Sequence, residues 1–269
     1  CLIEEIDTLV DEMIRDSKDA ETNESKAEVA FICGRAWNAM ETYQAAAEEN
    51  LSKAVKLDPA NALAWLELGL CFWKKGDKGQ AKQCLTESIT HKETPRALRE
   101  LSMLTRQIRF KGQKPEDLSM DSINLAKRAV ALGMQDHLSW YTLGNAWCFR
   151  FFNISNNVAD LKMSLKAYKK SQDVGGDVNP DLLHNRAECL RYLQDYDTAM
   201  ACYNDAFEID PSFSASKTGR SPLKHSPAQN LNTTPRPGEL SRRSVKVATP
   251  PTSGAVVFPM RSPQPGLLS

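Results

Sequence analysis

Apolar residues between about residues 28 and 213 recur at helical spacing, in paired segments. The clearest pair covers residues 62–95 and carries Trp65, Leu68, Gly69, Phe72, Gly76, Ala81, Leu85 and Ser88. Apolar positions three or four residues apart predict amphipathic helices. The small residues at 69, 81 and 88 would let two helix backbones approach closely. This pattern therefore predicts two packed helices whose large apolar side chains fill the core between them.

Counted from residue 62, the same residues follow the spacing of the tetratricopeptide repeat, a unit of about 34 residues. That spacing predicts five repeats, at residues 27–60, 62–94, 95–135, 137–176 and 180–213. In the third and fourth repeats the second helix comes late, so we expect long turns at 111–117 and around 151–160. Five repeats exceed the three usually needed for stability. We therefore predict an all-α, right-handed superhelix of five helix pairs.

The chain outside the repeats has a different character at each end. Apolar residues at helical spacing predict that residues 1–24 form an amphipathic helix that caps the first repeat. The sequence opens with Cys1 rather than Met, so we expect N-terminal sequence to be missing. Residues 214–269 are rich in Pro and Ser, a composition that predicts a disordered tail.

The formal net charge of zero conceals an asymmetry between the body and the tail. Residues 1–211 hold 26 Lys or Arg against 33 Asp or Glu, whereas residues 212–269 hold eight Lys or Arg and a single acid, Glu239. An acidic body argues against nucleic acid as the main partner and against sequence-specific DNA binding. The basic tail could still contact RNA, a ribosome surface or the body itself. No run of about 18 apolar residues occurs, so we expect no membrane span.

The sequence offers little for catalysis or cofactor binding. Its seven cysteines include no Cys-x-x-Cys pair, which favours reduced, buried thiols in a cytosolic or nuclear protein. The four histidines lack metal-ligand spacing, and no nucleotide-binding motif is present. We therefore expect no enzyme activity, no metal and no cofactor, and place the function on a surface.

Repeat geometry indicates which surface, because the first helix of each pair lines the concave side of such a superhelix. Cations near the middle of this groove and anions at its far end flank apolar and amide side chains. The groove therefore fits an extended peptide that carries both charges and an apolar residue. Alternatively, each charge only solvates a helix face or pairs with a neighbour in the groove. The predicted peptide-contacting residues are Arg99, Met103, Arg106, Tyr141, Asn145, Asp181 and Glu188.

Several joined strings go beyond the repeat pattern. They are LSKAVKLDP at 51–59, WKKGD at 73–77, LSM at 101–103 followed by RQIR at 106–109, SWYTLGN at 139–145, and NPDL with NRA within 179–187. With the irregular third repeat, they resemble the tetratricopeptide repeat protein 5 family over nearly all of residues 1–211.

That resemblance implies a reader of nascent chains. Members of the family bind the ribosome and recognise the N-terminal Met-Arg-Glu segment of nascent tubulin, then recruit an adaptor that leads to decay of tubulin mRNA. They also act as nuclear stress-response cofactors that bind a histone acetyltransferase. Carried over by motif, Arg106 and Asp181 would contact the peptide. Lys56, with Lys53 beside it, would contact the ribosome, or would otherwise lie on a solvated convex face. The localisation implied is cytoplasmic and nuclear.

The sequence departs from the family at its C-terminal end. Ala215 stands where the family has a further peptide-contacting glutamate, and the family's additional helix and OB-fold-like domain are replaced by the tail. The tail carries five candidate phosphorylation sites that precede proline, which are Ser221, Ser226, Thr234, Thr249 and Ser262.

Two other functions remain as alternatives. One is a nuclear transcription cofactor that uses surfaces outside the groove. The other is an adaptor for the acidic C-terminus of a heat-shock chaperone. That clamp needs Lys and Asn at fixed groove positions, where this sequence has Phe31, Arg35, Leu66 and Leu70.

Overall fold

The computed structural model describes Thr8 and residues 22–108 and 114–211, which form helices joined by short turns. Its α-helices are α2 (Asn23–Asn38), α3 (Ala45–Leu57), α4 (Ala62–Lys75), α5 (Lys78–His91), α6 (Pro95–Gln107), α7 (Pro115–Leu132), α8 (His137–Arg150), α9 (Val158–Ser171), α10 (Pro180–Tyr192) and α11 (Tyr196–Ile209). Two π-helical turns extend the fourth repeat, η2 (Phe151–Ser155) and η3 (Gln172–Gly176).

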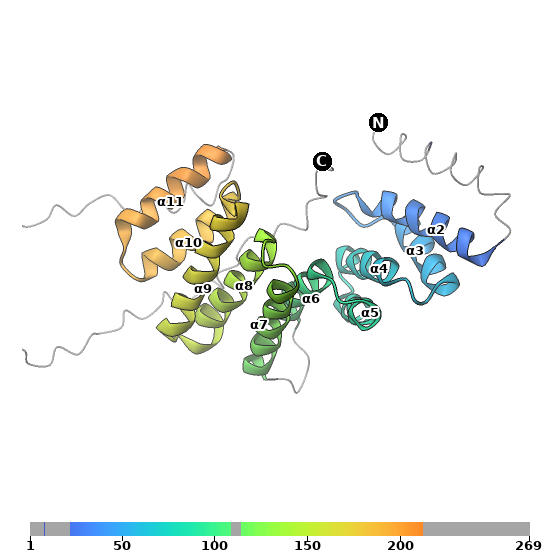
Figure 1. The fold of residues 1–269 in the computed structure, drawn as a ribbon, viewed down its shortest axis with the longest axis horizontal. Helices are drawn as coiled ribbons and strands as arrows, with labels where there is room; N and C mark the ends of the chain where they lie inside the picture. The colour runs from blue at the N-terminus through green and yellow to red at the C-terminus, as the bar shows by residue number, and fades with distance from the viewer. Residues whose placement is uncertain (1–7, 9–21, 109–113, 212–269) are drawn as a thin grey trace, which may run out of the picture.

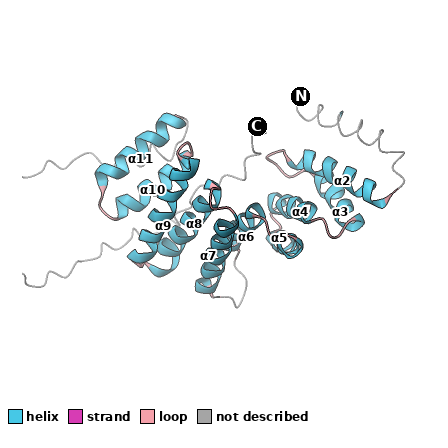
Figure 2. Ribbon diagram, in the orientation of Figure 1, coloured by secondary structure: helices cyan, strands magenta, loops and turns pink. Residues whose placement is uncertain are grey.

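Consecutive helices pack in pairs, from α2 with α3 to α10 with α11. The pairs stack into a curved array that runs from α2 at one end to α11 at the other (Figure 1). The described part of the chain is drawn as helices and connecting loops alone (Figure 2). First helices also contact one another across repeats, α2 with α4, α6 with α8 and α8 with α10, so they share one side of the array. The predicted all-α superhelix is confirmed.

Side-chain caps set where many of these helices begin. Asn61 Oδ1 accepts hydrogen bonds from the backbone N–H groups of Leu63 and Ala64, each at 3.1 Å. Asp77 caps α5 in the same way through Gln80 N at 3.0 Å. Such caps satisfy backbone donors that have no partner inside the helix. Gly76, with φ of 91°, ends α4 in a conformation that glycine adopts without strain.

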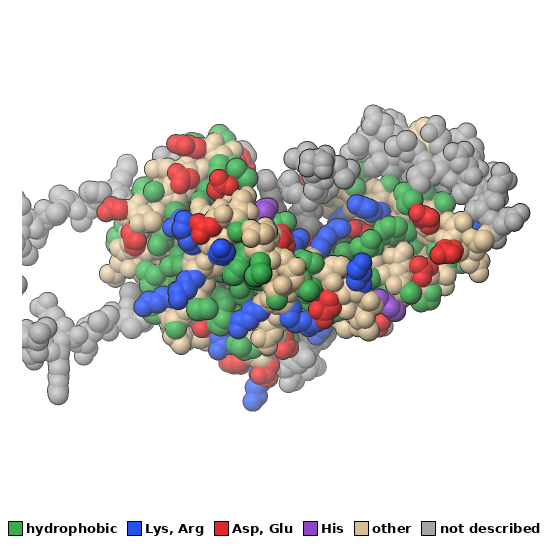
Figure 3. All heavy atoms as spheres, in the orientation of Figure 1, with side chains coloured by type: hydrophobic (Ala, Val, Ile, Leu, Met, Phe, Trp, Pro, Cys, Tyr) green, Lys and Arg blue, Asp and Glu red, His purple; other side chains and the backbone are tan. Residues whose placement is uncertain are grey.

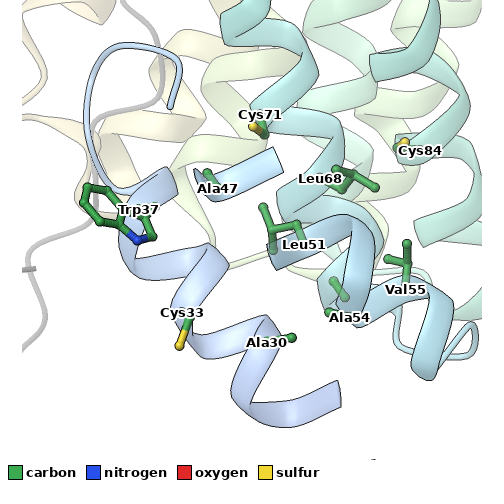
Figure 4. Packing of buried hydrophobic residues seen from close by; sticks show 11 residues of the cluster. Ala30, Cys33, Trp37, Ala47, Leu51, Ala54, Val55, Leu68, Cys71 and Cys84 are labelled. Carbon is green, nitrogen blue, oxygen red and sulfur yellow. The ribbon is translucent and has the colours of Figure 1, made fainter. Parts of the chain in front are cut away.

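The core is a series of clusters, each shared by adjacent helices. In the first, Ala47 and Leu51 of α3 face Leu68 and Cys71 of α4 (Figure 4). Leu51 and Cys71 are fully buried. No single repeat could bury these side chains alone, because each cluster includes side chains of a neighbouring pair.

Both predicted long turns differ from the helix boundaries of the structure. The turn at 111–117 ends early because Pro115 starts α7, and proline suits a first helical position whose N–H has no partner. The turn around 151–160 is mostly helical. α8 continues into η2, which ends at Asn156 with φ of 50°, and Asn157 then caps α9 through Ala159 N at 3.0 Å. Burial of Phe151 in the core explains why the chain stays helical there.

Two predicted segments lie largely outside the described residues: the capping helix at 1–24, apart from Thr8 and residues 22–24, and the tail at 214–269. Within the described residues, no helix is long and apolar enough to cross a membrane.

Candidate functional site

Arg106 lies in the last turn of α6 and is 7% exposed. Its Nη1 donates to the carbonyl oxygen of Thr142 at 3.4 Å and to Ser122 Oγ at 3.5 Å. Its Nε and Nη2 are buried with no hydrogen-bond partner in the described part of the chain. Burial lowers the pKa of the guanidinium to about 10, so it stays charged at neutral pH. The structure thus holds one side of Arg106 and leaves the Nε–Nη2 edge unsatisfied.

The irregular third repeat builds the contact that holds Arg106. Other helix pairs pack a small residue against a large one at this position. Here the Ser102 hydroxyl donates to the carbonyl oxygen of Ser122 at 2.8 Å, and the Ser122 hydroxyl donates to the carbonyl oxygen of Ser102 at 2.9 Å. Both side chains are fully buried. This polar junction between α6 and α7 puts the Ser122 hydroxyl beside Arg106 Nη1.

A network of four polar side chains continues the site into α8, α9 and α10. Asn145 Oδ1 accepts from the Tyr168 hydroxyl at 2.7 Å and from Asn185 Nδ2 at 3.1 Å. Asn185 Nδ2 also lies 3.5 Å from the Tyr141 hydroxyl. Tyr168 and Asn185 are not among the predicted peptide-contacting residues. Both are polar residues on helix faces that pack against α8, and this feature could have identified them from the sequence.

The Tyr141 hydroxyl is influenced by both opposite charges of the site. Burial raises the pKa of its hydroxyl, and the Asp181 carboxylate raises it further, whereas the hydrogen bond with Asn145 and the charge of Arg106 lower it. Arg106 and Asp181 therefore both lie within electrostatic reach of one hydroxyl. The structure brings together four of the predicted residues: Arg106, Tyr141, Asn145 and Asp181.

Arg99 and Glu188 lie apart from this group, in ion pairs of their own. Arg99 pairs with Asp136, the residue that caps α8. Glu188 accepts from Arg191 Nη2 at 2.5 Å and from the Tyr203 hydroxyl. These contacts match the alternative in which groove charges pair with neighbours. Met103, on α6 between Arg99 and Arg106, is half-buried.

The N-terminal half of the array contains buried charges that the repeat spacing did not indicate. Glu67 is 6% exposed, pairs with Arg96 at 2.8 Å and accepts from Asn38 Nδ2 at 2.9 Å. Glu100 is 5% exposed, and its Oε2 has no hydrogen-bond partner in the described ranges. Burial raises the pKa of Glu100 to about 7, even though Arg96 and Arg99 favour the charged form.

The remaining predicted residues lie elsewhere. Lys53 and Lys56 are both exposed on α3. The five candidate phosphorylation sites fall outside the described residues. Leu66 and Leu70, at two positions of the chaperone clamp, are buried in the core and offer no charged group.

The described residues contain no group of three His, Cys, Asp or Glu side chains that could hold a metal ion. Six cysteines are described, and all six are buried and free of disulfides.

The repeat architecture is matched by known families and structures. The tetratricopeptide repeat family matches residues 62–93 and 180–213. The structure of YrrB, described as a TPR protein with an unusual peptide-binding site, aligns with a TM-score of 0.54 at 15% identity, over 77% of this chain and 96% of that one. The Cut9–Hcn1 complex aligns with a TM-score of 0.57 at 17% identity, over 80% of this chain and 38% of that one. The chain belongs to the tetratricopeptide repeat proteins, a class of protein-binding adaptors.

Within that class, the chain is a homologue of tetratricopeptide repeat protein 5. It is 38% identical to the Bos taurus protein and 37% identical to the Homo sapiens protein, in each case over 193 residues. These matches cover 71% of this chain and 44% of each relative, so the chain spans less than half of their length.

Proposed function

We propose that the concave surface binds the N-terminal Met-Arg-Glu segment of nascent tubulin at the ribosome and so links tubulin synthesis to decay of its mRNA. The observation that carries the proposal is the unsatisfied Nε–Nη2 edge of Arg106. A guanidinium edge of this kind binds a carboxylate with two parallel hydrogen bonds. A glutamate side chain of the peptide would supply both acceptors.

The rest of the peptide fits the charges around Tyr141. Asp181, on the first turn of α10, would pair with the peptide arginine. The side-chain amide of Asn145 would donate to a peptide carbonyl, while its Oδ1 stays with Tyr168 and Asn185. Arg106 and Asp181, which both act on the Tyr141 hydroxyl, would thus fix the direction of a peptide with adjacent opposite charges.

Entry of the peptide requires a small rearrangement. The Nε and Nη2 atoms of Arg106 are fully covered, so side chains over them have to move before a carboxylate can reach them. The ligand would then replace an unsatisfied buried charge with a paired one, which is the more favourable state.

The exposed Lys53 and Lys56 on α3 support a ribosome contact on a different face from the groove. Lysines act as point charges toward phosphate, so this contact would not depend on RNA sequence. The groove and the ribosome-facing lysines would then act at the same time. YrrB offers a precedent for peptide binding by this fold.

The test is binding of a labelled Met-Arg-Glu-Ile peptide to the full chain. Arg106→Met should lower affinity by about 30- to 5,000-fold, as expected for truncation of one partner of a buried charge pair. Asp181→Asn should weaken binding for the same reason. In Arg106→Met, peptides with Glu or Gln at the third position should bind equally weakly, because the variant cannot distinguish them.

Arg99→Met is the matched control. It removes an arginine from the same helix, but one that already pairs with Asp136. It should leave the preference for Glu over Gln unchanged. Arg106→Met should also be at least as stable as the wild type, since replacing a poorly paired buried charge by an apolar side chain is often neutral or stabilising. A folded wild type that does not distinguish Met-Arg-Glu-Ile from Met-Arg-Lys-Ile would refute the proposal.

A further inference from the structure

The second helices of the last two repeats carry opposite charges. Helix α9 presents four exposed lysines, and the acid within it, Asp160, is 8% exposed and paired with Arg150 at 3.0 Å. Helix α11 contains no Lys, Arg or His and presents exposed carboxylates. The exposed charges are Lys162, Lys166, Lys169 and Lys170 on α9, and Asp197, Asp205 and Glu208 on α11.

These charges face the same side of the superhelix. The buried Tyr168 and Tyr203 occupy the same place in the two repeats, 35 residues apart. The same offset relates Lys162 to Asp197 and Lys170 to Asp205. Lysines of one repeat therefore stand where the next repeat has acids. On the face seen in Figure 3, Asp and Glu side chains gather over α11, and Lys and Arg side chains gather beside them where α9 lies.

Both helices contact α10. Arg186 of α10 donates through Nη1 to Gln172 Oε1, just beyond α9, at 3.0 Å, and lies 3.5 Å from Cys202 Sγ of α11. The basic row and the acidic row thus lie on the two helices that contact α10.

We infer that this surface is self-complementary and that two copies of the chain associate through it. A two-fold axis that runs between α9 and α11, along their length, places the α9 of each copy over the α11 of the other. Lys162 then lies opposite Asp197 of the partner subunit, and Lys170 lies opposite Asp205 of the partner subunit. Each ion pair forms twice, because residue i meets j and j meets i.

Met163, next to Lys162 in the sequence of α9, is 41% exposed and adds apolar contact area. Two helices a side make a small interface, so the dimer should be weak and sensitive to salt. Lys169 of α9 already pairs with Asp173 of its own chain at 2.9 Å, so it contributes less to the contact between the two copies.

The experiment is sedimentation equilibrium of the full chain at low and high salt. The wild type should dimerise at low salt and dissociate as salt rises. Lys162→Glu/Lys170→Glu should raise the dissociation constant of the dimer at least about ten-fold. Each charge reversal disrupts two ion pairs, because the two-fold axis repeats every contact. Asp197→Lys/Asp205→Lys should do the same. An equimolar mixture of the two variants should form a heterodimer, and a chain with all four reversals should dimerise again.

Lys53→Glu/Lys56→Glu is the matched control, with the same change in net charge on the exposed face of α3, and should leave dimerisation unchanged. A wild type that stays monomeric at every concentration would overturn the inference. So would a failure of the four-fold reversal to dimerise while its circular dichroism shows an intact fold. If the wild type is monomeric and binds a polyanion, and Lys162→Glu/Lys170→Glu loses that binding, the exposed lysines of α9 form a polyanion site instead.

Discussion

Arg106 and Glu100 lie on the same helix, both buried and both with unpartnered polar atoms. They respond differently to burial. Arg106 keeps its charge because its pKa is still about 10, whereas the pKa of Glu100 is about 7. A buried charge without full hydrogen bonding destabilises the folded state. For Arg106 the proposed peptide carboxylate removes that destabilisation, and for Glu100 a proton does.

The protonation of Glu100 predicts a pH-dependent stability. Its pKa is raised in the folded state from an ordinary 4.5 to about 7. Between these values the folded protein holds a proton that the unfolded chain releases, so the free energy of unfolding falls as pH rises, and the loss is complete above about pH 7. Glu100→Gln should therefore match the wild type near pH 4.5 and exceed it at pH 8 by on the order of 3 kcal/mol.

Urea denaturation of both proteins at a series of pH values measures this difference. Other groups titrate alike in the two proteins, so their contributions cancel in the difference between the two free energies of unfolding. Arg96, Arg99 and Glu67 are the charges that act on this carboxyl, and all three remain in the variant. Parallel stability curves for the two proteins would show that Glu100 does not take up a proton on folding.

At the scale of the helix pair, backbone approach depends on small residues. Gly34 and Gly69 face Leu51 and Leu85, and Gly144 of α8 faces Tyr168 of α9. A Cβ at Gly144 would lie 2.4 Å from Tyr168 Cε1, which is far inside van der Waals contact. Because the Tyr168 hydroxyl donates to Asn145, this helix contact also positions the candidate site.

Gly144→Ala should therefore destabilise the fold by about 1–3 kcal/mol, as overpacking of a well-packed core does. It should also weaken peptide binding, because the displaced Tyr168 ring moves Asn145. Thermal denaturation and peptide titration measure the two effects. Gly79→Ala is the control, since the nearest atom to its added Cβ is 3.5 Å away and alanine favours the helix. Equal effects of both substitutions would contradict the packing argument.

At the scale of the whole molecule, stability is divided among clusters that join neighbouring repeats. The fourth and fifth repeats share a cluster around Phe151, whose ring lies 4.9 Å from Phe152 and 4.8 Å from Tyr192, measured between centroids. In such arrays each repeat is stabilised mainly by its neighbours, so damage stays local. The two ends of the molecule should therefore open independently.

Phe151→Ala tests this independence. Removing a fully buried ring should cost about 3–5 kcal/mol and uncouple the last repeat. Hydrogen exchange should accelerate in α10 and α11 while α2 to α5 keep wild-type protection. Leu51→Ala, in the first cluster, should produce the opposite pattern. Uniform acceleration in either variant would show a single cooperative unit.

Much of this architecture is predictable from the sequence, because small and large residues alternate at fixed positions. The same spacing placed Arg106, Tyr141, Asn145 and Asp181 on first helices that face one another, and the structure brings these four together. The spacing describes the neighbours that a residue has within its own repeat. That information suffices for helix pairing and for the side of the superhelix a residue faces.

Contacts between repeats were harder to predict. Arg99 pairs with Asp136, a cap of the following repeat, and a spacing rule within one repeat carries no information about that partner. Glu67 and Glu100 are buried although charged residues are mostly exposed, and Glu67 is bonded to Asn38 and Arg96 of the neighbouring first helices. The repeat spacing also does not predict the π-helical turn η2, because its helicity depends on burial of Phe151 rather than on local sequence.

The covered edge of Arg106 has a consequence for the kinetics of recognition. A ligand carboxylate can pair with Nε and Nη2 only during the fraction of time in which the covering side chains are displaced. The observed association rate is then the encounter rate multiplied by that fraction, and falls below the usual range for a preformed site. Once the carboxylate is enclosed, the same cover has to open before it leaves. A modest affinity would thus be accompanied by a long residence time, which would let the proposed reader hold a growing chain while slower partners assemble around it.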